Sequence, residues 1–172
     1  MSMDDILMDK EFKAGVLTIS SKGSLGQRKD ESGQTAVRLL ENEGFYIAKT
    51  KIVPDNIRQI ADTLIEWVDN ERLSLIVTSG GTGLSPTDVT PQAMEEVIDY
   101  EVPGIAEAMR AASLKKTAHA MLSRAIAGVR GSCLIINLPG SPNGVKENLS
   151  VVFPGLKHGL SKLSGDTTDC AT

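Results

Sequence analysis

The sequence lacks the features that would mark a nucleic-acid-binding, secreted or membrane protein. Basic residues do not predominate: 18 lysines and arginines stand against 22 acidic residues, a net charge of −4, whereas a nucleic-acid footprint needs a basic patch. The N-terminal residues 1–5 are acidic, and no run reaches the roughly 18 apolar residues of a membrane span. We therefore predict a cytoplasmic protein that binds neither nucleic acid nor membrane.

Cysteine and histidine are also scarce, with two of each in the chain. Neither Cys133 nor Cys170 has a second cysteine or histidine at the spacing of a zinc site, so both are expected to be plain thiols. His119 and His158 are expected to be structural or surface residues. The chain also has no Gly-Lys-Ser/Thr, so a Walker A loop is excluded.

Short apolar runs alternate with segments of helical periodicity, the pattern of an α/β domain with a mostly parallel sheet. We predict a single domain over residues 1–172, with an ordered core from about 12 to 164 and ragged ends. The expected strands are 14–20, 45–53, 73–78, 125–129 and 133–137, and the expected helices are 32–43, 57–68, 90–98, 105–116 and 142–163.

Local signals refine this prediction. Residues 130–132 are too short a link for a crossover helix, which predicts an antiparallel strand at or near one edge of the sheet. The pair Thr90-Pro91 is expected to begin a helix with a capping hydroxyl followed by proline. Gly44 is expected to end the helix predicted at 32–43, and Pro154 is expected to kink or break the last helix.

Three unusual loops follow predicted strands, at the sheet edge where open α/β sheets bind ligands. The loop from Thr78 to Asp88 contains three glycines and several hydroxyl residues, so its backbone amides can approach an anion. Residues 53–56 form the second loop. The third, residues 137–144, opens a helix whose free amides suit phosphate. Taken singly, each loop also fits an ordinary turn, with Asp55 as a helix cap.

Two carboxylates and two amide-rich loops at one sheet edge suit a metal–phosphate site. Asp55 and Asp88 can hold Mg²⁺ on oxygen ligands while loop amides neutralise phosphate oxygens. Phosphoryl and nucleotidyl transfer depend chiefly on positioning and charge stabilisation, so no Ser-His-Asp constellation is required. A nucleotide hydrolase stays open as a function, although the Walker lysine is absent.

Several segments match a known family in order along the chain. They are Thr78-Ser79-Gly80-Gly81-Thr82-Gly83, Asp88-Val89-Thr90-Pro91, Val102-Pro103-Gly104, Ala120-Met121-Leu122-Ser123-Arg124-Ala125, Arg130-Gly131-Ser132 and Ile136-Asn137-Leu138-Pro139-Gly140-Ser141-Pro142. Over about residues 14–163 the chain resembles the molybdopterin adenylyltransferase family, the Mog-type bacterial enzymes and the G domains of plant and animal two-domain proteins. It departs from the family pattern at Ser21, where members often carry aspartate.

This resemblance implies a three-layer α/β/α fold, usually a homotrimer, that binds molybdopterin and ATP at the sheet edge. It implies that Asp55 and Asp88 are the essential carboxylates, with Asp88 as the ligand of Mg²⁺ and Asp55 assisting. The residues that it assigns to the ligand pocket are Gly80, Gly81, Thr82, Gly83, Ser123, Pro139, Gly140 and Ser141.

The implied reaction is attack by the terminal phosphate of molybdopterin on the α-phosphorus of ATP. Pyrophosphate leaves, and the adenylylated pterin passes to a molybdate-inserting enzyme. We expect the region of Ser123 and Gly140-Ser141 to hold the pterin and the loop 80–83 to hold nucleotide phosphate. The alternative function is a non-catalytic molybdopterin carrier or scaffold, which the presence of both aspartates disfavours. A molybdate-inserting domain normally belongs to a much longer chain.

Overall fold

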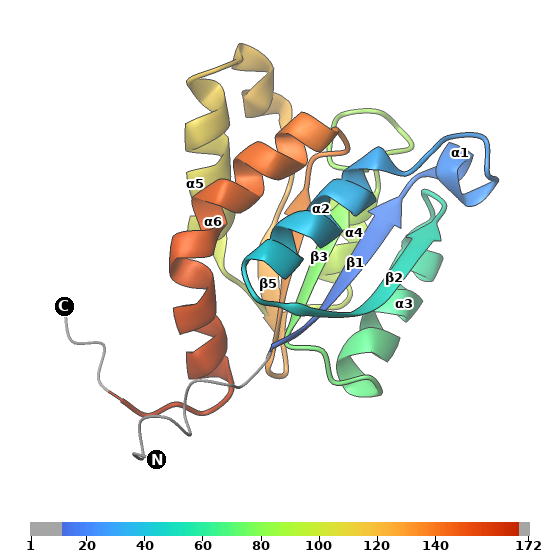
Figure 1. The fold of residues 1–172 in the computed structure, drawn as a ribbon. Helices are drawn as coiled ribbons and strands as arrows, with labels where there is room; N and C mark the ends of the chain where they lie inside the picture. Colours follow the sequence, from blue (N-terminus) through green and yellow to red (C-terminus); the bar gives the residue numbers. More distant parts are fainter. Residues whose placement is uncertain (1–11, 169–172) are drawn as a thin grey trace.

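The computed structural model describes residues 12–168, which build one six-stranded sheet with helices on both faces (Figure 1). The strands are β1 (Lys13–Ile19), β2 (Tyr46–Val53), β3 (Leu75–Ser79), β4 (Tyr100–Glu101), β5 (Ala127–Arg130) and β6 (Cys133–Leu138). The helices are α1 (Ser21–Ser24), α2 (Glu31–Asn42), α3 (Ile57–Asp69), α4 (Thr90–Glu95), α5 (Pro103–Leu114), the 3-10 helix η1 (Ala118–Leu122) and α6 (Pro142–Leu163). The predictions for Cys170 and for the outermost residues of the chain lie outside this range.

The sheet has the strand order β2-β1-β3-β6-β5-β4. Its first four strands are parallel, and β5 turns back antiparallel to β6, as the short link between them predicted. The outer edge is β4, which pairs antiparallel with β5 and was not predicted. A strand of two residues is too short for its side chains to show a period, so only pairing with β5 reveals it. The predicted α/β fold, mostly parallel with an antiparallel edge, is confirmed.

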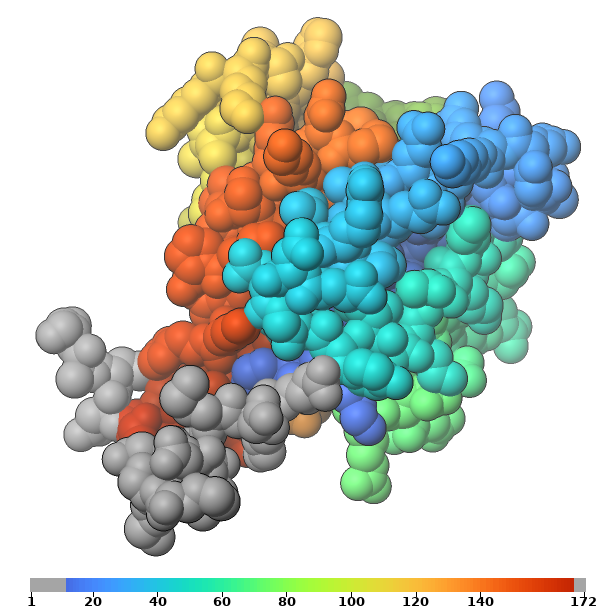
Figure 2. Space-filling view, in the orientation of Figure 1, coloured from blue at the N-terminus to red at the C-terminus, as the bar shows by residue number. Residues whose placement is uncertain are grey.

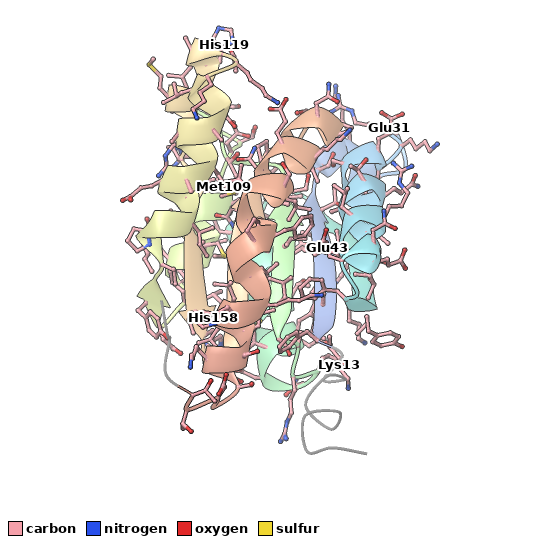
Figure 3. All side chains as sticks on the ribbon, turned by 60° about the vertical axis from the view of Figure 1, so that its left-hand side comes forward. Lys13, Glu31, Glu43, Met109, His119 and His158 are labelled. Carbon is pink, nitrogen blue, oxygen red and sulfur yellow. The ribbon has the colours of Figure 1, made fainter. Side chains whose placement is uncertain are left out.

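Alternate residues of the central strands feed two separate cores, because successive side chains of a strand point to opposite faces. On β1, Val16 packs into the core beneath α2, α5 and α6, whereas Leu17 packs into the core beneath α3 and α4. On β6, Ile136 and Ile135 divide in the same way. Met109 is buried in the first core and lies between α5 and α6 (Figure 3). The sheet therefore lies between two layers of helices, with one core on each of its faces, which gives three layers.

Two helix ends differ in how well the sequence predicted them. Gly44 follows the C-cap of α2 with φ +85°, the left-handed conformation expected at that position. The prediction that Thr90 caps α4 is wrong. Val89 occupies the cap position without a side-chain hydrogen bond, and the Thr90 hydroxyl donates to the Gly80 carbonyl at 2.8 Å. The helix ends at Glu95, earlier than predicted.

The last helix, α6, is continuous through Pro154 and does not break there. It changes direction partway along its length (Figure 1), as expected of a helix that has lost one backbone donor. No helix in residues 12–168 has the length and apolar character to cross a membrane. Cys133 is a free thiol on β6, as predicted, and burial raises its pKa to about 12.

Candidate functional site

The carboxyl ends of β1, β3 and β6 lie at one edge of the sheet. In Figure 3, Lys13 at the start of β1 is at one end of the molecule, and Glu31 and His119 are at the opposite end, where these strands finish. Polar side chains that end the strands are fully buried there. The Asn137 amide donates to the Thr78 hydroxyl at 3.0 Å. This bond ties β3 to β6 directly beneath their loops.

The backbone of the glycine loop is held by Thr90 and by the neighbouring strands. The Thr90 amide donates to the Gly81 carbonyl at 3.1 Å, and the Gly80 amide donates to Leu138 at 3.1 Å. Gly80 and Gly81 have φ +105° and +68°. A Cβ on Gly80 would lie 2.4 Å from the Ile19 carbonyl oxygen, and one on Gly81 2.3 Å from Thr90 Oγ1. Only glycine fits this path.

Backbone amides of two loops are left available to a ligand. Within residues 12–168, the amides of Gly81, Thr82 and Gly83 have no hydrogen-bond acceptor, and neither do those of Gly140 and Ser141. The amide of Gly80, by contrast, donates to the Leu138 carbonyl. The loops therefore present the unpaired donors that an anion needs, in the part of the glycine loop that follows Gly80.

Asp88 ends a turn that holds its carboxylate in place. The Ser85 amide donates to Asp88 Oδ2 at 3.0 Å, and the Asp88 amide donates back to the Ser85 carbonyl at 2.9 Å. Arg124 connects this turn with the glycine loop, because its Nε donates to the Gly83 carbonyl and its Nη2 to the Asp88 carbonyl, at 2.9 and 2.6 Å. Arg124 was not among the residues predicted for the site, although it lies in the matched segment 120–125.

Asp55 is not the cap of α3, because Asn56 is the residue that accepts from the first helical turn, at 3.0 Å from the Gln59 amide. Asp55 Oδ2 instead accepts from both the amide and the hydroxyl of Ser21, at 2.9 and 2.7 Å. The Ser21 hydroxyl oxygen accepts in turn from the Asp55 amide at 3.1 Å. Ser21 is the position where the sequence departs from the family pattern, and here it orients the carboxylate.

Both aspartates line the same cavity, which has a volume of about 610 Å³. Gly80, Gly81 and Gly140 line it as well. A second cavity, of about 370 Å³, is lined by the remaining predicted pocket residues, Thr82, Gly83, Ser123, Pro139 and Ser141. The structure thus divides the predicted residues between two cavities. Each loop contributes residues to both cavities, and the expected assignment of one loop to each ligand stays a prediction.

The second cavity has a partly apolar wall and a few polar groups that the sequence did not indicate. Ala106, Met109 and Leu122 contribute apolar surface. Arg110 Nη1 donates to the Ala125 carbonyl at 2.7 Å, and the Asn148 amide donates to the Gly144 carbonyl at 2.8 Å. These residues lie on helices, where helical periodicity predicts only that they face inward. No sequence pattern indicates that they meet at one cavity.

The donor set of the first cavity fits a magnesium ion that is shared with a phosphorylated ligand. Among residues 12–168, no three His, Cys, Asp or Glu side chains come together as a metal site. Mg²⁺ is usually bound through one or two carboxylates, with phosphate oxygens and water completing its shell. Asp55 and Asp88 each have one carboxylate oxygen without a hydrogen bond to the described chain. Two such oxygens suit that coordination.

The chain is similar to known proteins over most of its length. Residues 15–158 match the family described as "Probable molybdopterin binding domain". The molybdopterin adenylyltransferase of Helicobacter pylori is 39% identical over 158 residues, with 88% of each chain covered. Gephyrin of Dictyostelium discoideum is 39% identical over 166 residues, but this chain spans only 23% of its length. The molybdopterin biosynthesis enzyme MoaB of Thermus thermophilus superposes with a TM-score of 0.85 at 48% identity, covering 90% of this chain and 98% of that one.

Proposed function

The chain belongs to the family of molybdopterin-binding domains, and on this basis we propose that it is a molybdopterin adenylyltransferase of molybdenum cofactor biosynthesis. The observation that carries the proposal is the pair of adjoining cavities. Adenylyl transfer has to hold two ligands side by side, and the loops between the cavities touch: a Cβ on Gly140 would lie 3.3 Å from the Gly80 Cα. A carrier of one ligand has no need of the second cavity.

In the proposed reaction, an oxygen of the terminal phosphate of molybdopterin attacks the α-phosphorus of ATP. The new phosphorus–oxygen bond forms as the bond between the α-phosphorus and the bridging oxygen breaks, and pyrophosphate leaves with the electron pair. The free amides of Gly81, Thr82 and Gly83 stabilise the negative charge on the oxygens around the α-phosphorus. Asp55 and Asp88 would hold Mg²⁺, which when bound would neutralise phosphate charge and polarise the phosphoryl oxygens.

The subsites follow the cavities. We assign the triphosphate of ATP to the first cavity, because that cavity contains both carboxylates. The pterin belongs to the second, because a flat heterocycle suits an apolar wall with a few polar groups. The α-phosphorus then lies at the boundary, where the glycine loop passes from one cavity to the other.

The direct test is incubation of the protein with molybdopterin, ATP and Mg²⁺, followed by mass analysis of the products. The proposal expects adenylylated molybdopterin and one pyrophosphate for each pterin consumed. Binding of molybdopterin without any adenylylated product, over a range of Mg²⁺ concentrations, would instead establish the carrier function.

Replacement of Ser123 by alanine is expected to weaken binding of molybdopterin by about 1 kcal/mol, because one neutral hydrogen bond is lost. Ser123 lines the second cavity, and its hydroxyl oxygen accepts only a long bond, 3.3 Å, from the Ala125 amide. The affinity for ATP should not change. Calorimetric titration of each ligand measures both effects, with Ser164→Ala as the control, because the Ser164 hydroxyl bonds only to its own helix. If the variant instead binds ATP more weakly and binds pterin as the wild type does, the assignment of the two subsites is reversed.

We further propose that the protein works in the cytoplasm as a homotrimer and passes its product to a molybdate-inserting enzyme. The trimer rests on the family resemblance. Multi-angle light scattering at micromolar concentration is expected to give three times the 18.3 kDa mass of the protomer. A mass equal to one protomer under these conditions contradicts the trimer.

A further inference from the structure

The connection between α1 and α2, residues 25–30, forms one wall of the first cavity. It continues from the carboxyl end of β1, and Figure 2 shows this blue segment projecting from the body of the molecule. Arg28 and Lys29 lie on this connection, and both line the cavity that contains Asp55 and Asp88. They are the cationic side chains among the residues that line it. Both are exposed to solvent.

The backbone of this connection is held at both ends. The Gly26 amide donates to Gly23 at 3.0 Å, and the Gln27 amide donates to Lys22 at 2.9 Å. At the other end, Asp30 caps α2 by accepting from the Gly33 amide at 2.8 Å. The positions of Arg28 and Lys29 beside the cavity are therefore set by backbone bonds that do not involve their side chains.

The charged groups of Arg28 and Lys29 have no partner within residues 12–168. Neither side chain forms a hydrogen bond or an ion pair with another described residue. The neighbouring carboxylate of Asp30 is already taken, because it accepts from the Thr18 hydroxyl at 2.8 Å as well as capping α2. The arginines of the site differ in this respect: Arg110 and Arg124 each donate to backbone carbonyls. Two unpaired cations thus line a cavity that is also lined by the carboxylates of Asp55 and Asp88, besides the neighbouring Asp30 and Glu31.

We propose that Arg28 and Lys29 bind the β- and γ-phosphates of the nucleotide and make the site selective for a triphosphate over a monophosphate. This inference rests on the proposed function, because it assigns ATP to the first cavity. A nucleoside triphosphate brings more negative charge than one Mg²⁺ neutralises. Negative charge on the leaving pyrophosphate also grows as the α-phosphorus bond breaks, so cations beside it favour the transition state. Arginine and lysine are the usual partners of phosphate oxygens.

The test is direct titration of ATP, AMP and inorganic triphosphate into the protein with Mg²⁺ present and no pterin. Arg28→Ala and Lys29→Ala should each weaken ATP and inorganic triphosphate about tenfold, and the double variant about a hundredfold, since each loses a charge-assisted contact. AMP affinity should stay within about twofold, because AMP lacks the β- and γ-phosphates. Lys22→Ala is the matched control, because Lys22 is an exposed cation of α1 that lines neither cavity.

Two further results separate a phosphate contact from a structural effect. Arg28→Lys should keep most of the ATP affinity, and the weakening by Arg28→Ala should shrink as salt is raised. Unchanged ATP affinity in the double variant, or an equal loss for AMP, overturns this inference while leaving adenylyl transfer standing if the wild type makes product. A wild-type protein that binds no ATP overturns the proposed function and this inference together.

Discussion

Replacement of Asp88 by asparagine is expected to lower the rate of adenylyl transfer by at least about 100-fold, because the proposed ligand of Mg²⁺ loses its charge while keeping its volume. The free energy of unfolding should change by less than about 1 kcal/mol, since an amide oxygen can still accept from Ser85. The backbone of Asp88 stays held by Arg124 at 2.6 Å. Product formation followed by mass analysis and urea denaturation measure the two quantities.

A matched control is Asp62→Asn. Asp62 is an exposed aspartate of α3 that pairs only loosely with Arg58, at 3.7 Å, and lines neither of the two site cavities. The Asp62→Asn variant should retain wild-type turnover. The concentration of Mg²⁺ needed for half-maximal ATP binding should rise in Asp88→Asn and not in the control. Turnover like that of the wild type in Asp88→Asn would remove Asp88 from the mechanism.

Replacement of Gly81 by valine is expected to weaken ATP binding more than tenfold and to destabilise the fold by roughly 2 to 4 kcal/mol. The backbone at Gly81 has φ +68°, which a β-branched residue tolerates poorly. The added Cβ would meet Thr90 Oγ1 at 2.3 Å, so the bond from that hydroxyl to the Gly80 carbonyl cannot survive unchanged. Calorimetry with ATP and denaturation in urea measure the two losses.

Gly131→Val separates the cost of the backbone angle from the cost of the clash. Gly131 has φ +57°, close to that of Gly81, but nothing lies within 4 Å of its added Cβ, and it sits on the turn between β5 and β6. This variant should lose stability from backbone strain alone and keep wild-type ATP affinity. If Gly81→Val abolishes pterin binding and leaves ATP binding intact, the two subsites are reversed.

The sequence by itself determined the layers of the fold and most of their elements. Residues 57–68 repeat apolar side chains at helical spacing, and the structure has α3 at Ile57–Asp69. The apolar run of 73–78 predicted a strand covered on both faces, and β3 is buried at every position. These predictions succeed because burial of periodic apolar side chains is a local property of the chain, readable within one element.

The sequence indicated residues that line the two cavities, but not how those residues are arranged. Asp55 and Asp88 were predicted as site residues because each lies in a loop that follows a strand, and the strand ends of a parallel sheet meet at one edge. Nothing near Asp55 in the sequence indicated Ser21 as its partner, since 34 residues separate them. The same holds for Arg124 and the Asp88 carbonyl, 36 residues apart.

Only the tertiary structure decided how the two loops share their residues. Gly80 and Gly83 are three positions apart, yet they line different cavities, because the backbone turns at Gly80 and Gly81 with positive φ. Likewise, Thr90 looked like a helix cap, but its hydroxyl bonds to Gly80 across the loop. A hydroxyl satisfies whichever acceptor the fold brings closest, and local sequence contains no information about an acceptor supplied by another part of the chain.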